Sequence, residues 1–144
     1  MTLITITLAG VPRGKGRGRA VSIPGVGARV YSDPATVKYE GQLRHAATQA
    51  MAGRPPLEGP ISVVMDIRFP VPASWSKKAR ARALSGEAMP TVKPDADNTL
   101  KLCDALNEVV FRDDKQVVDA RVLKRYSETP GMTIWVEPYY RGPS

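Results

Sequence analysis

The residues with the chemistry to act on a substrate are concentrated in one segment, residues 93–119. Asp95 and Asp97 lie near its start, Lys101 follows one helical turn later, and Asp114 lies near its end. Mg²⁺ is a hard cation that takes carboxylate oxygens together with phosphate and water. A nearby lysine can hold a scissile phosphate and stabilise the transition state. The segment therefore predicts metal-assisted phosphoryl transfer, with Mg²⁺ (or Mn²⁺ in its place) as the cofactor, Asp95, Asp97 and Asp114 as metal ligands and catalytic residues, and Lys101 as the catalytic cation.

An apolar-periodic stretch, Leu100–Phe111, predicts the helix that positions these groups. Either Asp97 or Asn98 suits its N-terminal end. On a helix of 3.6 residues per turn, four apolar side chains share the packed side and four polar side chains form a stripe. The packed residues are Leu102, Leu106, Val109 and Val110, and the stripe is Asp97, Lys101, Asp104 and Glu108.

Several acidic or basic residues of this segment also have a simpler structural explanation. Asp97 can cap the helix, and Lys101 can pair with a carboxylate one turn away. Asp113–Asp114 can form the turn before a strand. The concentration of these residues within a basic chain is what favours a metal site.

The remaining elements follow from periodicity and from turn and cap residues. Alternating apolar residues predict strands over Leu3–Leu8, Ile61–Phe69, Val117–Tyr126 and Met132–Val136, the last two joined as a hairpin by the turn Thr129-Pro130-Gly131. Helices are expected from about Ala35 to Ala52, begun by Pro34, and from Trp75 to Leu84, capped by Ser74. The chain shows no internal repeat, so we expect one domain over residues 1–144 of the α/β (α+β) class, a mixed β-sheet with helices packed on it.

The composition narrows the class of protein. Of the 144 residues, 42% are hydrophobic and 24% are charged, which is typical of a globular domain. The single cysteine, Cys103, and the single histidine, His45, exclude an intrachain disulfide, a cysteine-based zinc site and a multi-histidine metal cage. The first ten residues lack a signal-peptide pattern, and no stretch approaches the ~20 apolar residues of a membrane span. We therefore expect a cytoplasmic protein with no membrane partner.

The charge is basic and unevenly distributed. The net charge is +7, and residues 1–54 carry eight basic and two acidic side chains, whereas residues 91–144 carry eight and nine. A basic domain of this size often binds nucleic acid. The alternation of glycine and basic residues predicts a flexible basic loop over residues 10–30. The candidate DNA-binding residues are Arg13, Lys15, Arg17, Arg19, Lys77, Lys78 and Lys93.

The motifs of the catalytic segment form a specific combination. The run Lys93-Pro-Asp-Ala-Asp-Asn98 is followed by Lys101, Asp104-Ala-Leu-Asn107, Asp113-Asp114, Gln116-Val-Val-Asp119 and Lys124. This combination resembles the RusA family of Holliday junction resolvases. The N-terminal strand, the Pro-Arg-Gly-Lys loop and the tyrosine-bearing first helix are also similar to that family, so the resemblance covers nearly the whole chain.

The resemblance implies a homodimeric, Mg²⁺-dependent endonuclease that resolves four-way DNA junctions by paired symmetric nicks, in DNA recombination and repair. The family's metal-binding aspartates fall on Asp95, Asp97 and Asp114, and its catalytic lysine falls on Lys101. Many such proteins are encoded by phages or prophages. A two-fold dimer presents one identical site per protomer, which matches the approximate two-fold symmetry of a junction. The segments over residues 10–27 and 70–90 are longer than in compact members.

Two other hypotheses stay open at this point. Pro94-Asp95 followed by Asp113-Asp114-Lys115 also fits the spacing of restriction-type nucleases, in which Asp113 and Lys115 would act. The second is a non-catalytic basic DNA- or RNA-binding module whose carboxylates only cap helices. Its binding would fall steeply with salt and would need no divalent metal.

Overall fold

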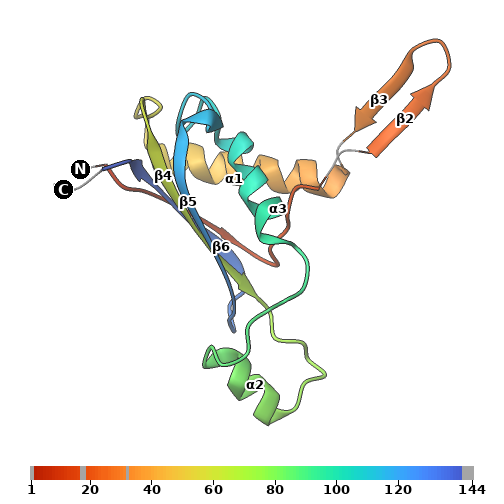
Figure 1. Ribbon diagram of the computed structural model, residues 1–144, viewed down its shortest axis with the longest axis vertical. Helices are drawn as coiled ribbons and strands as arrows, with labels where there is room; N and C mark the ends of the chain where they lie inside the picture. The colour runs from red at the N-terminus through yellow and green to blue at the C-terminus, as the bar shows by residue number, and fades with distance from the viewer. Residues whose placement is uncertain (1, 17–18, 32, 141–144) are drawn as a thin grey trace.

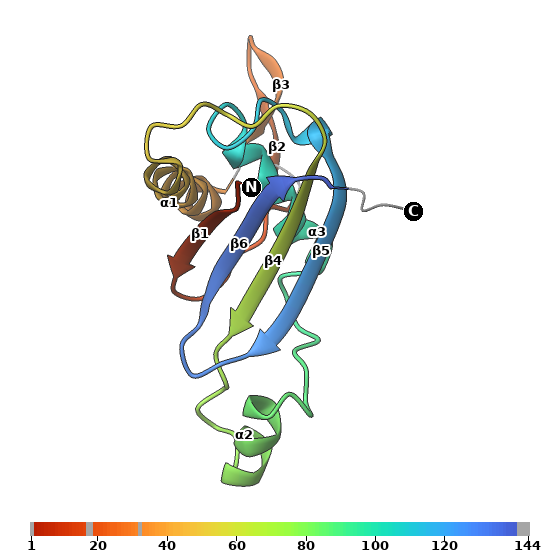
Figure 2. The ribbon, with the colours of Figure 1, turned by 90° about the vertical axis from the view of Figure 1, so that its left-hand side faces the viewer.

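A four-stranded mixed sheet with the strand order β1-β6-β4-β5 forms the centre of the protein (Figures 1 and 2). The computed structural model describes residues 2–16, 19–31 and 33–140. β4 pairs in parallel with β5 and antiparallel with β6, which pairs antiparallel with β1. The strands are β1 (Ile4–Ala9), β4 (Ile61–Phe69), β5 (Val117–Tyr126) and β6 (Gly131–Pro138).

The helical segments α1 and α3 lie on one face of this sheet (Figure 1). α1 covers Pro34–Met51 and α3 covers Ala96–Leu100. Two 3₁₀ helices follow α3 in the chain, η1 (Lys101–Leu106) and η2 (Asp114–Gln116). In Figure 2 the other face of the sheet is turned to the viewer, and no helix of the described residues covers it. The predicted α/β class, a mixed sheet with helices packed on it, is confirmed. None of the described helices has both the length and the apolar character needed to cross a membrane.

The core lies between the sheet and the helices. Alternate residues of β4, from Ile61 to Phe69, are buried, as the alternation of the sequence predicts. α1 begins with Pro34 at its first turn and ends where Ala52 adopts a left-handed conformation, which confirms its predicted range within one residue. Its buried residues recur every three or four positions and are Thr36, Tyr39, Leu43, Ala47 and Met51.

The predicted hairpin of the last two strands is wrong, because β4 lies between β5 and β6. The turn after β5 passes over the end of β4, where the amide of Ser127 donates a hydrogen bond to the carbonyl of Phe69 at 2.9 Å. β4 takes the position with a neighbour on each side because it is mostly buried, whereas half of the β5 residues are exposed and β5 forms an edge.

The segment predicted as a flexible basic loop, residues 10–30, contains a two-stranded sheet instead. β2 (Arg19–Ile23) and β3 (Gly27–Tyr31) pair antiparallel and project from the body as a hairpin (Figure 1). The amide of Val26 donates to the carbonyl of Ile23 at 3.0 Å, and Gly25 has a φ of +79°. Proline followed by glycine of positive φ is the requirement of a type II turn, and this local geometry holds the hairpin.

The second predicted helix, α2 (Lys77–Leu84), stands apart at the far end of the long axis (Figure 1). Its N-cap is Ser76 and not Ser74, because the Ser76 hydroxyl accepts a hydrogen bond from the amide of Ala79. The ring of Trp75 packs edge-to-face on Tyr126 of β5 with 5.3 Å between centroids. α2 is therefore attached to the sheet at its N-terminal side.

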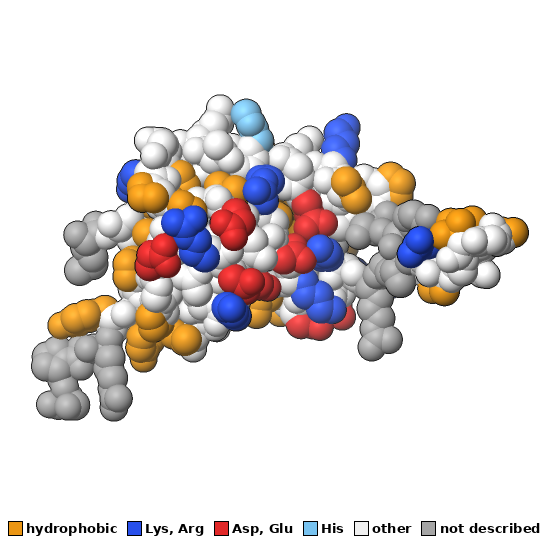
Figure 3. Space-filling view, turned by 90° about the horizontal axis from the view of Figure 1, so that it is seen from above, with side chains coloured by type: hydrophobic (Ala, Val, Ile, Leu, Met, Phe, Trp, Pro, Cys, Tyr) orange, Lys and Arg blue, Asp and Glu red, His pale blue; other side chains and the backbone are white. Residues whose placement is uncertain are grey.

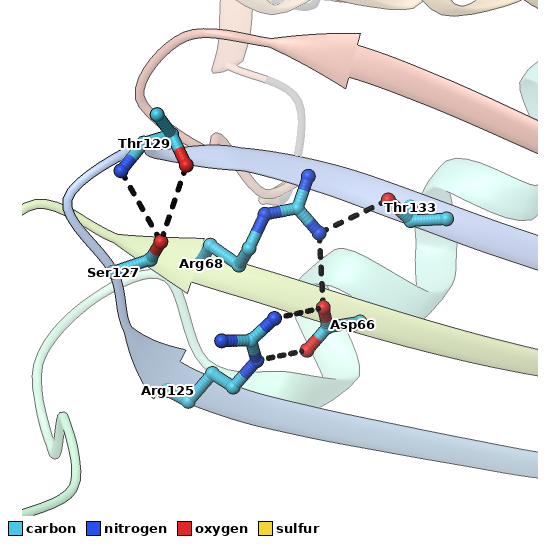
Figure 4. Close-up of polar contacts among 6 residues, drawn as sticks. All are labelled: Asp66, Arg68, Arg125, Ser127, Thr129 and Thr133. Atoms are coloured by element: carbon cyan, nitrogen blue, oxygen red, sulfur yellow. Dashed lines mark hydrogen bonds and ion pairs between the residues drawn. The ribbon is translucent and has the colours of Figure 1, made fainter. Parts of the chain in front are cut away.

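A carboxylate on the uncovered face connects strands β4 and β5 (Figure 4). Asp66 of β4 is only 7% exposed. Its two oxygens accept hydrogen bonds from Arg125 of β5 at 2.8 and 2.9 Å and from Arg68 at 2.9 Å. Arg68 also donates to the hydroxyl of Thr133 on β6 at 3.0 Å. Burial raises the pKa of Asp66, but the hydrogen bonds from Arg125 and Arg68 outweigh it and lower the pKa below its usual range.

Candidate active site

A cavity of about 490 Å³ lies between the segment α3–η1 and the edge strand β5. Three of the four predicted catalytic residues, Asp97, Lys101 and Asp114, line it. Asp119 lines it as well, and Leu100 and Cys103 contribute apolar walls. The structure therefore brings together, around one space, carboxylates that are 22 residues apart in the sequence.

α3 determines where the first pair of aspartates lies. Asp95 is the N-cap residue of α3, and Asp97 is in its first turn. The carboxylate of Asp97 accepts no hydrogen bond from the residues that the structure describes, so it is available to a ligand. Asp95 instead lines a neighbouring cavity of about 350 Å³ with Arg13, Lys93 and Asn98. The two predicted ligands thus line separate cavities on either side of the first turn of α3.

The single helix predicted over Leu100–Phe111 is wrong, and so is the polar stripe along it. The helix begins at Ala96, narrows to a 3₁₀ helix from Lys101 onward and ends at Leu106. Four of the six η1 residues are buried, and a 3₁₀ helix repeats every three residues and not every 3.6, which breaks the predicted spacing. Glu108 has a φ of +65° and pairs with Arg112 outside the helix.

Lys101 lies where the α-helix changes to the 3₁₀ helix. Its ammonium donates a hydrogen bond to the side-chain oxygen of Asn98 at 3.1 Å, within the same turn. Lys101 is exposed, and Asp104, the next residue of the predicted stripe, pairs with another lysine, Lys15. The contact with Asn98 leaves the Lys101 cation at the wall of the cavity.

In the second aspartate pair, Asp113 has a structural role, whereas the carboxylate of Asp114 is open to the cavity. Asp113 caps η2: its carboxylate accepts from the amide of Lys115 at 2.9 Å, and the side chain of Gln116 accepts from the amide of Asp113 at 2.8 Å. The hydrogen bond from the Lys115 amide holds the pKa of Asp113 below its usual range. Asp114 has one long contact, from the amide group of Asn107 at 3.4 Å, and its carboxylate lines the cavity.

Asp119 was absent from the predicted site. The pairing of β4 with β5 shifts between Ile61 and Ser62, so that Val118 is an extra residue in β5 and Asp119 pairs with Ser62. A bulge of this kind redirects the side chains that follow it and is frequent beside active sites. The acidic residue at the start of an exposed strand, directly after Gln116-Val-Val, was the available signal, but the shift in pairing is not visible in the sequence.

The glycine-rich segment before the hairpin packs directly on α3. The amide of Lys15 donates to the carbonyl of Asn98 at 2.7 Å. A Cβ atom at Gly14 would lie 2.8 Å from the Cβ of Pro94 and 2.9 Å from that of Asn98. Only a residue without a side chain allows this approach, so Gly14 determines how closely the segment covers the first turn of α3.

Lys15 connects this segment to two helices through carboxylates. Its ammonium lies 2.6 Å from Asp104 of η1 and 3.3 Å from Glu40 of α1. The hydrogen bond to Asp104 raises the pKa of Lys15. Burial, followed by the hydrogen bond with Asp104, raises the pKa of Glu40. The predicted DNA-binding residue Lys15 is thus held in an ion-paired cluster that fixes η1 against α1.

The lining residues differ in their suitability for a metal. Within the described ranges, no three histidine, cysteine or acidic side chains lie close enough to form a ready-made cage. Burial, with the charges of Asp114 and Asp104, raises the pKa of Cys103 to about 12, so its thiol is neutral and a poor ligand. Asp97, Asp114 and Asp119 supply carboxylate oxygens, and these donors fit a hard divalent cation such as Mg²⁺.

The predicted DNA-binding residues are spread over the length of the molecule. Lys77 and Lys78 are exposed on α2, Arg13 pairs with Asp33 at 3.1 Å, and Lys93 lines the cavity of Asp95. Arg19 is the first residue of β2, and Arg17 lies outside the described residues. Figure 3 shows acidic and basic side chains intermixed at the centre of one end, with the hairpin extending to one side.

The chain is similar to a known protein family and to a curated protein over nearly its whole length. The family model described as endodeoxyribonuclease RusA matches residues 9–137. The chain is also 40% identical over 142 residues to an uncharacterized protein, YqaN, of Bacillus subtilis (strain 168), and the match covers 94% of this chain and 96% of the relative. The match to the family includes the hairpin, α2 and every residue that lines the cavity.

Proposed function

The chain belongs to the RusA endodeoxyribonuclease family, and on that premise we propose that it is a Mg²⁺-dependent, structure-selective endonuclease that resolves four-way DNA junctions by paired symmetric nicks. Its role is in DNA recombination and repair. It acts as a homodimer with one site per protomer, because a two-fold dimer matches the two strands of a junction that are cut.

The observation that carries this proposal is the single cavity between α3–η1 and β5. Asp97, Asp114 and Lys101 line it, although they come from three different elements. Hard oxygen donors beside a cation are the combination that phosphodiester hydrolysis requires. Asp113 and Lys115 form no such combination, because the carboxylate of Asp113 is occupied in capping η2. The geometry therefore supports Asp114 and Lys101 over the restriction-type pair.

Each lining residue has a distinct role in the proposed reaction. Asp97 and Asp114 would hold the divalent cation, with Asp119 of β5 as a further donor. Asp95, which lines the neighbouring cavity, is the third predicted ligand. The chemistry that a bound cation supplies is neutralisation of charge on the phosphodiester and activation of the attacking water. Lys101, positioned by Asn98, binds the scissile phosphate and stabilises the negative charge of the transition state.

The test uses a synthetic four-way junction and a linear duplex of the same sequence, each incubated with the protein in Mg²⁺ or in EDTA. We expect paired nicks in the junction alone and in Mg²⁺ alone. Asp97→Asn should abolish cutting while junction binding survives, and Glu137→Gln on β6, away from the cavity, should cut as the wild type does. An Asp97→Asn protein that cuts at the wild-type rate would refute the assignment. Binding without cutting in any divalent metal would favour the non-catalytic module.

The metal can be tested without cleavage. A cation that binds only the folded protein raises its melting temperature by mass action. Millimolar Mg²⁺ should therefore stabilise the wild type and should stabilise Asp97→Asn and Asp114→Asn less. Equal shifts in all three proteins would show that the cation binds elsewhere.

A further inference from the structure

The β2–β3 hairpin is an arm with no partner of its own in the described structure. Its strands form a separate two-stranded sheet, and they pair with none of the four central strands. Figures 1 and 2 both show it projecting beyond α1 and the sheet. A two-stranded hairpin is marginally stable in water unless it packs on something. Its position therefore suggests a surface that is completed on binding.

The end of the hairpin is apolar. Val26 in the turn is 52% exposed and Val21 is 38% exposed, while Pro24 is exposed and Ile23 is half-buried. Figure 3 shows hydrophobic side chains gathered at the outer end of the arm. The type II turn at Pro24-Gly25 keeps this end narrow, because it reverses the chain within two residues.

The charge of the hairpin is basic. Residues 19–31 contain two arginines, Arg19 and Arg29, and no aspartate or glutamate. Arg29 of β3 is directly opposite Val21 of β2, so a cation and an apolar side chain share one face of the hairpin. This charge complements a polyanion and disfavours a second copy of the same arm, which would bring like charges together.

We propose that the hairpin inserts its apolar end, Val21, Ile23 and Val26, against the base pairs at the branch point of a DNA junction, while Arg29 contacts the adjoining phosphate. The inference rests on the proposed function. Architectural proteins insert aliphatic side chains between base steps and must overcome base stacking to do so. At a branch point the stacking between arms is already interrupted, so the same insertion costs less there than in a duplex. The hairpin is thus a reader of branched structure.

The experiment uses a four-way junction with 2-aminopurine at the branch point, whose fluorescence rises when the base is unstacked, in EDTA so that no strand is cut. The variant is V21S/V26S, which leaves every charge in place. Its control is V37S on α1, where Val37 is 55% exposed, close to the exposure of Val26. We expect the wild type and V37S to raise the fluorescence and V21S/V26S not to. We also expect V21S/V26S to lose roughly tenfold in junction affinity, since burying two exposed valine side chains against the bases contributes about that much, and to keep its duplex affinity.

The outcomes separate the inference from the function. If the wild type and V21S/V26S raise the fluorescence equally and prefer the junction equally, the insertion is wrong, although junction cutting still stands. If V21S/V26S changes only the oligomeric state measured by light scattering, the arm binds a second copy and the insertion is again wrong. If the wild type neither binds nor cuts the junction, the proposed function fails and the inference fails with it.

Discussion

Two lysines, Lys101 and Lys115, each follow a pair of aspartates, but they differ in what their neighbours do. Lys101 lines the cavity with Asp97 and Asp114. The backbone amide of Lys115 donates a hydrogen bond to the carboxylate of Asp113. The side chain of Lys115 is exposed on η2. The two residues therefore offer a direct comparison of two catalytic assignments in one protein.

We predict that Lys101→Ala lowers the rate of junction cutting by about 10²–10³-fold, the usual cost of removing one group that stabilises a transition state. Lys115→Ala should cut within a few-fold of the wild type. Single-turnover rates on saturating junction measure both. The reverse order of the two rates would favour the restriction-type assignment.

Gly14 is a second residue whose role depends on its surroundings. We predict that Gly14→Ala lowers the free energy of unfolding by about 1–3 kcal/mol, because its Cβ would lie too close to Pro94 and Asn98 and the segment must move away. It should also slow cutting, since the same turn carries Asp97 and Asn98. Gly16→Ala is the matched control, since nothing lies within 4 Å of its Cβ position. Urea unfolding and cutting rates of the two variants should differ, and equal values would show that the contact does not matter.

At this scale the sequence predicted three of the polar residues that line the cavity. Asp97, Lys101 and Asp114 were predicted because their types and spacing within one segment are unusual, and their catalytic roles stay predictions. The position of Asp119 at the cavity depends on a bulge in β5, and the position of Asp95 in the neighbouring cavity depends on the turn that begins α3. Such backbone features arise from packing between distant segments, and no local pattern records them.

At the scale of the elements, Asp66 connects strands β4 and β5 on the uncovered face of the sheet. The arginines Arg68 and Arg125 face its carboxylate from β4 and β5, and all three groups lie on the side without helices (Figure 4). Because the folded protein holds the pKa of Asp66 below the unfolded value of about 3.9, ionised Asp66 stabilises the fold above that pH. This stabilisation is lost as the pH falls through the lowered pKa.

We predict that Asp66→Asn lowers the free energy of unfolding by about 2–4 kcal/mol at pH 7, since it leaves two arginines without their carboxylate. The difference from the wild type should shrink as the pH falls below about 4, where the wild-type carboxylate becomes neutral too. Urea unfolding at a series of pH values gives both curves. Glu137→Gln, on the same face of the sheet, is the control, and a difference that stays constant down to pH 2 would contradict the assignment.

Periodicity predicted single elements better than their partners. β4 and α1 have the predicted ranges because their burial repeats every two residues and every three to four, respectively. The pairing of β5 with β6 was wrong because a turn sequence reports only that the chain reverses, not which strand lies between. The β2–β3 hairpin was not predicted because the glycine and arginine residues around it favour a flexible loop, although Pro24-Gly25 is a turn sequence.

The whole molecule is long, and basic residues lie at both of its ends as well as around the cavity. α2, which contains Lys77 and Lys78, lies at one end, and the hairpin, which contains Arg29, lies at the other (Figure 1). The elements that border the cavity, α3 and β5, lie between them. Contacts with phosphates contribute affinity by releasing counterions, so they make binding depend on salt. Both ends are therefore expected to contribute to binding without reading sequence.

We predict that Lys77→Ala/Lys78→Ala reduces the slope of log affinity against log salt by about 1–2 for a junction, because each phosphate contact contributes roughly 0.9. The Mg²⁺-induced rise in melting temperature should be unchanged, since α2 is remote from the cavity. The control is Lys38→Ala, an exposed lysine on α1. Binding isotherms at several salt concentrations provide the measurement, and an unchanged slope would show that α2 does not contact DNA.

The strand order has a consequence for synthesis on the ribosome. β6, over residues 131–138, lies between β1 and β4, so the first strand of the chain has no place in the sheet until that segment emerges. By then every carboxylate of the cavity, the last being Asp119, has already been made. A chain that ends early leaves the facing edges of β1 and β4 unpaired, which favours aggregation or degradation over a stable fragment. An incomplete translation product therefore carries the acidic residues of a nuclease without the sheet that assembles them.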